Sequence, residues 1–200
     1  YDGTALTAGE VSVSGDGFAE GEGATFEVTG SQTLVGSSKN YFGYALSAAT
    51  KAGNYAITKS EGTLTVTNRA EDARFEVTVE AKSGTAPYDG QEHSVSGLVS
   101  DAFTINGVEY TVSGLTAGAA GTDAGKYTAA VEGTPVVTDE DGNDVTDQFL
   151  VKTQPGTLTI SQRQVTLTSA SAERAYDGTA LTAGEVSVSG DGFAEGEGAT

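Results

Sequence analysis

The chain has 200 residues, of which 28 are acidic and 10 are basic, so its formal net charge is −18 and its pI is near 4.1. This charge disfavours nucleic acid and anionic lipid as partners, because their phosphates repel an acidic surface. Cysteine, methionine and tryptophan are absent, which excludes a disulfide framework and leaves folding to an apolar core and to strand ladders.

Short β-strands are predicted along the whole chain, because apolar side chains alternate with polar ones between turns rich in Gly and Asp. The alternating sets are, in chain order, Val11 and Val13, Phe26 and Val28, Leu64 and Val66, Phe75 with Val77 and Val79, Tyr110 and Val112, Leu158 and Ile160, and Val165 and Leu167. Only residues 45–52 fit a helix, of two turns at most. The sequence therefore predicts an all-β protein.

The chain repeats itself. Residues 1–25 recur without a change as residues 176–200, and Tyr-Asp-Gly begins at positions 1, 88 and 176. Gly-Thr-Leu-Thr occurs at residues 62–65 and 156–159, each time ahead of a Tyr-Asp-Gly unit. A tandem array produces such copies, whereas an active site has no use for them. We therefore predict two related repeats that alternate, here called repeat A and repeat B.

The predicted boundaries place repeat A at residues 1–70, repeat B at residues 71–163 and the start of the next repeat A at residues 164–200. Residues 1–70 contain no counterpart of the strand predicted at Val165–Ser169. That strand has either been trimmed away, which we favour, or is donated by another molecule. The segments that join the repeats are short and charged, so they cannot act as flexible coils, and we expect the repeats to be held end to end.

Each repeat is long enough for a small domain without disulfides. Many short strands with polar turns favour a small β-sandwich of the immunoglobulin-like kind. The alternative is a β-grasp-like unit, in which residues 45–52 supply one short helix.

The order of the motifs resembles the MBG/YDG-type tandem repeats of large bacterial cell-surface proteins. Repeat A carries Tyr-Asp-Gly, Gly30-Ser31-Gln32-Thr33 with Val35-Gly36, residues 54–58 (NYAIT) and residues 62–66 (GTLTV), and repeat B carries the related residues 122–127 (TDAGKY), 144–147 (DVTD) and 156–160 (GTLTI). The resemblance covers essentially the whole chain. It implies secretion and display on a cell wall, of the Gram-positive kind, in a role similar to that of adhesin stalk modules. It carries no catalytic residues to transfer.

One acidic cluster has the composition of a calcium loop. Asp139, Asp141, Asn143 and Asp144 offer oxygen ligands, but the Gly and Glu that an EF-hand loop needs at its sixth and twelfth positions are replaced by Asp144 and Leu150. The alternative is a plain hairpin that turns at Asp141-Gly142, and we favour it.

Other candidate sites have simpler explanations. His93 is the only histidine, no Gly-x-Ser-x-Gly nucleophile motif exists, and repeat A has no histidine, so His93 is expected to be a surface residue. In each Tyr-Asp-Gly unit we expect Asp to accept backbone N–H bonds and Gly to supply a positive φ. A Lys–Asn isopeptide bond remains an alternative, with the candidates Lys39, Lys51, Lys59, Lys82 and Lys126 facing Asn40, Asn54, Asn68 or Asn106.

Together these observations predict a protein that is not an enzyme and needs no cofactor: a structural stalk or fibre segment of a surface adhesin that projects a terminal functional domain. Its partners are the neighbouring repeats, with host glycan or protein bound outside this stretch. One alternative is a glycan- or mucin-binding repeat that uses aromatic residues such as Tyr41, Phe42 and Tyr44. Another is an accessory module of a secreted glycosidase.

Overall fold

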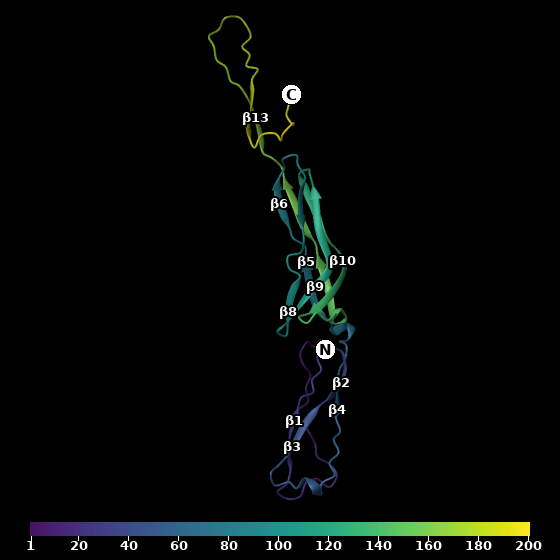
Figure 1. Ribbon diagram of the computed structural model, residues 1–200. Helices are drawn as coiled ribbons and strands as arrows, with labels where there is room; N and C mark the ends of the chain where they lie inside the picture. Colours follow the sequence, from purple (N-terminus) through teal and green to yellow (C-terminus); the bar gives the residue numbers. More distant parts are fainter. The chain divides into compact units, whose positions relative to one another are not determined.

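The computed structural model describes residues 1–200 and confirms an all-β protein, with 47% of residues in strands and 4% in short helical turns (Figure 1). The helical turns are three 3-10 segments of three residues each: η1 (Ala52–Asn54), η2 (Glu71–Ala73) and η3 (Thr146–Gln148). No helix has the length and apolar character needed to cross a membrane.

The short helix that the β-grasp-like alternative places at residues 45–52 is not formed. Ala45 and Leu46 end strand β3 (Phe42–Leu46), which pairs antiparallel with β1 (Ala24–Val28). The ladder places Leu46 opposite Ala24, so backbone groups that a helix would need are bound to the neighbouring strand. Only η1 at the end of the segment is helical, which removes the helix on which the β-grasp-like alternative depended.

The chain forms two compact units. The first consists of Tyr1–Glu76, Ala102–Thr111 and Val136–Leu150, and the second consists of Val77–Asp101, Val112–Pro135 and Val151–Thr200. The predicted repeat boundaries at residues 70 and 163 stay predictions.

The first unit contains two two-stranded ladders, β1 with β3, and β2 (Gly36–Asn40) with β4 (Gly62–Val66). It also contains a tight hairpin in which β8 (Ala102–Ile105) pairs with the first residues of β9 (Val108–Gly121). The turn is Asn106-Gly107, and both residues have positive φ, 53° and 84°. Two such residues form the turn that matches the twist of paired strands, which explains why Asn-Gly stands here. The buried apolar residues of this unit are Leu64, Tyr110, Val137, Val145 and Phe149.

The long strands build the largest sheet, whose order is β6-β12-β10-β9-β7 with β8 paired to β9. The remaining members are β6 (Gly84–Pro87), β7 (His93–Ser96), β10 (Gly125–Asp139) and β12 (Gly156–Ser161). A separate pair joins β5 (Phe75–Glu80) to β11 (Phe149–Gln154). In the second unit the buried apolar residues are Val79, Ala81, Val112, Ala129, Leu158, Ile160 and Ala194.

Strand β9 changes its inward face at Gly114. Tyr110 and Val112 are buried before it, whereas Leu115 and Ala117 are the half-buried residues after it, so the alternation shifts by one residue. Gly114 has φ +76°, and a side chain on Gly133 of the neighbouring strand would meet its carbonyl. A β-bulge of this kind adds one residue to a strand and lets a glycine adopt the left-handed conformation.

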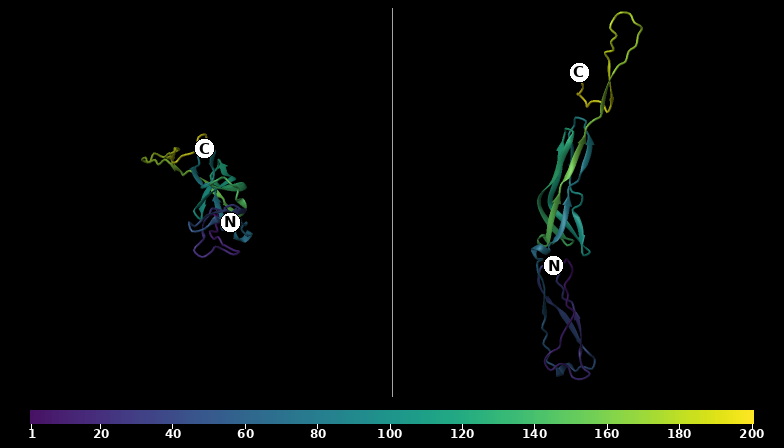
Figure 2. Two further views of the ribbon diagram at one scale, coloured as in Figure 1. Left: turned by 60° about the horizontal axis from the view of Figure 1, so that its bottom comes forward. Right: turned by 180° about the vertical axis from the view of Figure 1, so that it is seen from behind.

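The last ladder pairs β13 (Val165–Ser169) with β14 (Val186–Gly190), drawn in yellow-green and yellow in Figure 2. The strand predicted at Val165–Ser169 is thus confirmed. Strand β14 lies in the second copy of the 25-residue repeat. The identical residues of the first copy, Val11–Gly15, form no strand.

Candidate functional site

In the acidic cluster at residues 139–144, carboxylate oxygens accept hydrogen bonds from groups of the turn itself. The Asp139 carboxylate accepts the backbone N–H of Asn143 at 2.8 Å and of Asp141 at 3.1 Å, and the Asn143 side chain donates to it at 3.0 Å. Asp144 accepts the hydroxyl and backbone N–H of Thr146, which lower the pKa of its carboxyl group. No group of three His, Cys, Asp or Glu side chains is arranged to hold a metal ion.

The residues around this cluster form the hairpin given as the alternative. The Val145 N–H donates to the Val137 carbonyl at 2.9 Å, and Thr138 bridges Asp144 in antiparallel fashion. Gly142 supplies the positive φ, +81°, at the turn. The oxygen-rich composition therefore builds a turn.

The three Tyr-Asp-Gly units form the predicted turn. Asp2 and Asp177 each accept the N–H and the hydroxyl of the Thr two residues later, and Asp89 accepts the N–H of Gln91. These bonds lower the pKa of all three carboxyl groups, with the backbone N–H as the largest cause. The glycines at positions 3, 90 and 178 have φ of 83°, 79° and 78°. The roles expected of Asp and Gly are confirmed in every copy, whereas Tyr176 is 97% exposed.

His93 is tied to the second of these turns. Its Nε2 lies 2.9 Å from Asp89 Oδ1, and its side chain is 24% exposed, so it is half-buried against the turn. The Asp89 oxygen also accepts the Gln91 N–H, which means that the carboxylate holds both the turn and the imidazole. Asp89 therefore orients the His93 ring, and the contact between them stabilises the Tyr88-Asp89-Gly90 turn.

Several of the lysines and asparagines proposed for an isopeptide bond make other contacts. Lys39 and Lys59 pair with Glu61 at 3.6 and 3.0 Å. The Asn40 side chain donates to the Ala8 carbonyl, and Asn106 donates to the Asp2 carbonyl. None of these contacts brings a lysine amine to an asparagine amide.

Within the first unit, the Tyr1-Asp2-Gly3 turn packs on residues from the β8–β9 hairpin. The Asn106 side chain donates to the Asp2 carbonyl at 3.0 Å, and the Tyr1 and Tyr110 hydroxyls are 3.4 Å apart. A Cβ on Gly3 would stand 2.1 Å from the Tyr110 hydroxyl, so only glycine fits there. Burial, followed by the hydrogen bond to Tyr110, raises the pKa of the Tyr1 phenol above its ordinary value.

Arg69 fixes the same turn from the other side. Its guanidinium donates to the Tyr1 carbonyl at 2.8 Å and to the Ala73 carbonyl at 2.5 Å, and it stacks over the Phe75 ring at 3.9 Å. A planar guanidinium can bond and stack at once, which a lysine cannot do. The Arg69 backbone N–H donates in turn to Gln148.

Gln148, the buried polar residue of this region, is 3% exposed. Its amide oxygen accepts the Arg69 N–H at 3.0 Å, and its amide nitrogen donates to the Asn68 side chain at 2.6 Å. Both ends of the amide are therefore satisfied, as burial requires. An aromatic cluster lies beside it, with Phe149 in contact with Phe75, Phe103 and Tyr110 at ring separations of 4.9–5.6 Å.

The second unit contains a related arrangement around Arg163. Its guanidinium donates to the Tyr88 carbonyl at 3.3 Å, to the Gly192 carbonyl at 2.8 Å and to the Asp191 carbonyl. The Asp191 carboxylate accepts the Gln164 N–H at 2.8 Å, and the Tyr88 hydroxyl donates to Glu197. One arginine thus joins the end of β12, a Tyr-Asp-Gly turn and the Asp-Gly turn after β14.

Arg69 and Arg163 hold the same place in the sequence. Each is the seventh residue after the Gly that starts a Gly-Thr-Leu-Thr strand, and each donates to the carbonyl of a tyrosine in a Tyr-Asp-Gly turn. We call these contacts the arginine junctions. Sequence reasoning noted that these segments were short and charged but assigned no contacts to their arginines. The signal was present as Asn-Arg and Gln-Arg after the two matching strands.

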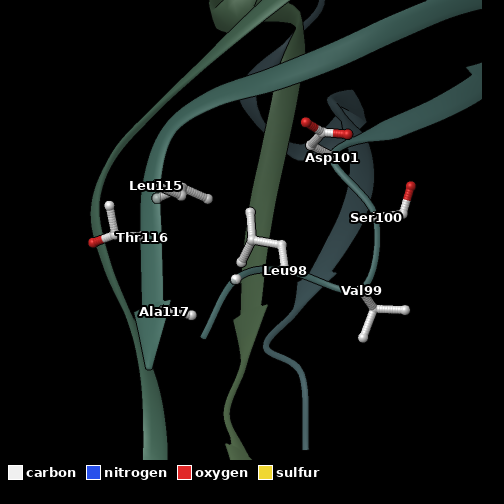
Figure 3. A pocket seen from close by; sticks show the side chains of 8 residues that line it. Leu98, Val99, Ser100, Asp101, Leu115, Thr116 and Ala117 are labelled. Carbon is white, nitrogen blue, oxygen red and sulfur yellow. The ribbon is translucent and has the colours of Figure 1, made fainter. Parts of the chain in front are cut away.

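A shallow cavity of about 390 Å³ lies in the second unit between residues 97–101 and 115–117 (Figure 3). Leu98 and Leu115 point toward each other across it, whereas Val99 points away and is 61% exposed. Its lining includes the apolar residues Leu98, Leu115 and Ala117 and the acidic residue Asp101. No convergent set of catalytic groups lines it.

The aromatic residues proposed for glycan contact lie on or next to β3. Tyr41 is 53% exposed and Tyr44 is 42% exposed, whereas the Phe42 ring packs edge-on against Phe26 and under the Lys59 amine. Two of the three rings are therefore accessible. Comparisons of the chain with family models, with curated proteins and with solved structures found no match.

Proposed function

We propose that the chain is a non-enzymatic segment of the stalk of a bacterial surface adhesin, built from tandem small β-sandwich domains of the immunoglobulin-like kind. The observation that carries the proposal is the arginine junction, which recurs at Arg69 and Arg163. Each junction consists of hydrogen bonds from a guanidinium to backbone carbonyls. A stalk needs a contact of this kind at each boundary between repeats, because it restricts the orientation of one repeat relative to the next.

Three further properties support a stalk. The 25-residue copy and the recurring Tyr-Asp-Gly turns indicate a modular array, in which each module contacts its neighbours. The net charge of −18 keeps an extended protein soluble and discourages lateral sticking. Finally, the histidine and the acidic cluster stabilise turns, so neither is left as a catalytic constellation.

Solution scattering tests the proposal. A compact chain of 200 residues has a radius of gyration of about 16 Å. An end-to-end stalk segment is expected to give a clearly larger value and an elongated distance distribution. The matched variant Arg69→Ala with Arg163→Ala should show a broader range of distances, because the junction bonds are gone. A compact, folded-back wild-type chain would contradict the stalk.

A second candidate function is glycan binding, which the exposure of Tyr41 and Tyr44 favours. Aromatic faces are common sugar contacts because they combine an apolar surface with a polar edge. A glycan array with the purified chain tests this function. Submillimolar binding that is lost in Tyr41→Ala with Tyr44→Ala, and retained in Tyr176→Ala, would replace the pure spacer by a binding module. No binding leaves the stalk as the function.

A further inference from the structure

A buried pair of side-chain amides joins the end of repeat A to repeat B. On the predicted boundaries, Asn68 and Arg69 belong to repeat A and Gln148 belongs to repeat B. Gln148 is 3% exposed, its amide nitrogen donates to the Asn68 side-chain oxygen at 2.6 Å, and its amide oxygen accepts the Arg69 N–H at 3.0 Å. A buried amide is costly when it is left without a partner, so the lengths of the two side chains have to match.

Both positions of this pair exist in each repeat, and the residue types follow the kind of repeat. Counted from the Gly that starts each Gly-Thr-Leu-Thr strand, the position six residues later holds Asn68 in repeat A and Gln162 in repeat B. The position eight residues earlier holds Asn54 in repeat A and Gln148 in repeat B. Repeat A therefore carries Asn at both positions, and repeat B carries Gln at both.

The local structure around Asn54 and Gln148 is also the same. Asn54 is the last residue of η1 and Gln148 is the last residue of η3. The Asn54 N–H donates to the Lys51 carbonyl and the Gln148 N–H donates to the Val145 carbonyl, each at 2.9 Å. The residue after each turn is aromatic and extended, with φ of −122° and −121°. The two positions therefore correspond in structure as well as in sequence.

We propose that this amide pair makes each repeat accept a repeat of the other kind as its neighbour. The inference rests on the proposed tandem array. Where repeat A is followed by repeat B, Asn68 meets Gln148, as the structure has it. Where repeat B is followed by repeat A, Gln162 meets the Asn54 of that repeat A. Both boundaries then join one short amide to one long amide, so the combined length of the two side chains is the same.

Boundaries between repeats of the same kind do not fit. If repeat A followed repeat A, Asn68 would meet Asn54, and the pair would be one methylene too short, which leaves buried amide groups unpaired. If repeat B followed repeat B, Gln162 would meet Gln148, and the pair would be one methylene too long for the same space. Penalties of this kind give specificity by acting against the wrong partner rather than by adding affinity for the right one.

Exchanging the two amides within this chain provides the first test. Asn68→Gln produces the pair of two long amides, and Gln148→Asn produces the pair of two short ones, so each variant reproduces one mismatched boundary. Urea denaturation is expected to show that each single variant lowers the folding equilibrium constant by about tenfold, because a buried amide loses its partner or is displaced. The double variant again has one Asn and one Gln, and its equilibrium constant should return to within about threefold of the wild-type value.

The same substitutions at exposed positions are the matched controls. Asn54 and Gln162 are exposed in this chain, so Asn54→Gln and Gln162→Asn should each change the equilibrium constant by less than about twofold. A double variant that loses as much as the two single variants together would overturn the proposal, because the amides would then act independently. Single variants at positions 68 and 148 that behave like the controls would overturn it too.

A longer chain, in which residues 1–175 are followed by residues 1–200, tests the boundary from repeat B to repeat A. In the first copy, Gln162→Asn is now expected to lower the folding equilibrium constant by about tenfold, and Asn54→Gln in the second copy should restore it. Solution scattering of the same chains separates this proposal from the stalk. An elongated chain without coupling between the two amides overturns the pairing alone, whereas a compact chain in which the coupling persists overturns the stalk alone.

Discussion

At the scale of single residues, each arginine junction shows how one side chain holds several stretches of backbone together. Arg163 donates to three backbone carbonyls and Arg69 donates to two while stacking on a ring. Backbone carbonyls are present whatever the neighbouring side chains are, so these contacts do not depend on the identity of those side chains. The fork of donors in arginine reaches several acceptors in one plane, whereas a lysine offers one point charge.

Arg163→Lys tests this geometry. The lysine keeps the charge but cannot reach the carbonyls of Tyr88, Asp191 and Gly192 together, so we expect a loss of about 1.5 kcal/mol or more in local stability. Hydrogen exchange should show weaker protection at residues 186–192. Arg174→Lys is the control, because Arg174 bonds only to the neighbouring Asp177 and Thr179, and it should change little. Equal protection in wild type and Arg163→Lys would refute the role.

Gly156 is required by the closeness of two backbones. A Cβ at this position would stand 2.3 Å from the Lys82 carbonyl oxygen and 2.7 Å from that of Ala81, and backbone cannot give way as a flexible side chain can. Gly156→Ala is expected to lower the free energy of unfolding by about 3 kcal/mol. Gly53→Ala, where the added carbon meets nothing within 4 Å, should change it by less than about 0.5 kcal/mol. Urea denaturation measures both, and similar values would contradict the account.

The turn aspartates predict acid sensitivity. Hydrogen bonds from nearby N–H and hydroxyl groups lower the pKa of Asp2, Asp89, Asp144 and Asp177 below the ordinary value of 3.8. A carboxyl whose pKa is depressed in the folded state stabilises the fold above its unfolded pKa, and this contribution is lost as the pH falls through the folded pKa. We therefore expect the melting temperature to fall on acidification below a pH of about 4.

Carboxyl NMR titration measures this directly, and midpoints at or above 3.8 for these four residues would disprove the prediction. Asp2→Asn is the matched variant, because the amide oxygen still accepts the Thr4 N–H but does not titrate. Its acid-induced loss of stability should be smaller than that of the wild type.

Local rules explain what could be predicted from the sequence at this scale. In Tyr-Asp-Gly the Asp binds the N–H two residues later and the Gly supplies a positive φ, so the turn could be predicted from the local sequence. The turn at Asp141-Gly142 could be predicted in the same way. Arg163, by contrast, binds the carbonyl of Asp191, which is 28 positions away in the sequence, and that of Tyr88, which is 75 positions away. Nothing in the local sequence identifies such partners, and the arginine junctions were missed for that reason.

At the scale of strands, a neighbouring strand determines whether a segment becomes a β-strand as much as its own sequence does. Residues 45–52 have helical composition, yet Ala45 and Leu46 belong to β3 because β1 supplies a ladder. Alternation predicted the strands around Phe75, Leu158 and Val165 correctly. It predicted Val11–Val13 as a strand too, and that prediction is wrong, because these residues belong to no ladder. Long-range pairing is thus what alternation alone cannot supply.

The aromatic cluster makes Phe149 the key side chain among these elements. Phe149 is 4% exposed and contacts Phe75, Phe103 and Tyr110. Phe149→Ala is expected to reduce the free energy of unfolding by about 3–5 kcal/mol, since it removes a large buried ring. The control is Phe26→Ala, at a ring that is 39% exposed, which should cost far less. Denaturant unfolding compares the two, and an equal cost would show that the cluster is not central.

At the scale of the whole molecule, charge sets the conditions under which the chain stays dispersed. With a net charge of −18 at pH 7 and a pI near 4.1, electrostatic repulsion disappears as the pH approaches 4. We expect light scattering to show reversible association of chains near the pI. At pH 7 we expect no association through lateral contacts between chains. Added salt at pH 7 should act in the same direction but more weakly, because it screens the charge without removing it. Association that peaks far from the pI would contradict this view.

The two identical 25-residue copies differ in structure, so in NMR spectroscopy one copy can serve as the internal reference for the other. Val13 and Val188 share every neighbour in sequence for ten residues on either side, so their random-coil chemical shifts cancel in a difference. What remains of that difference reports the folded surroundings of each copy, which for Val188 include the ladder between β13 and β14. The two signals are expected to coincide only when both copies are unfolded, so their separation measures folding within a single spectrum.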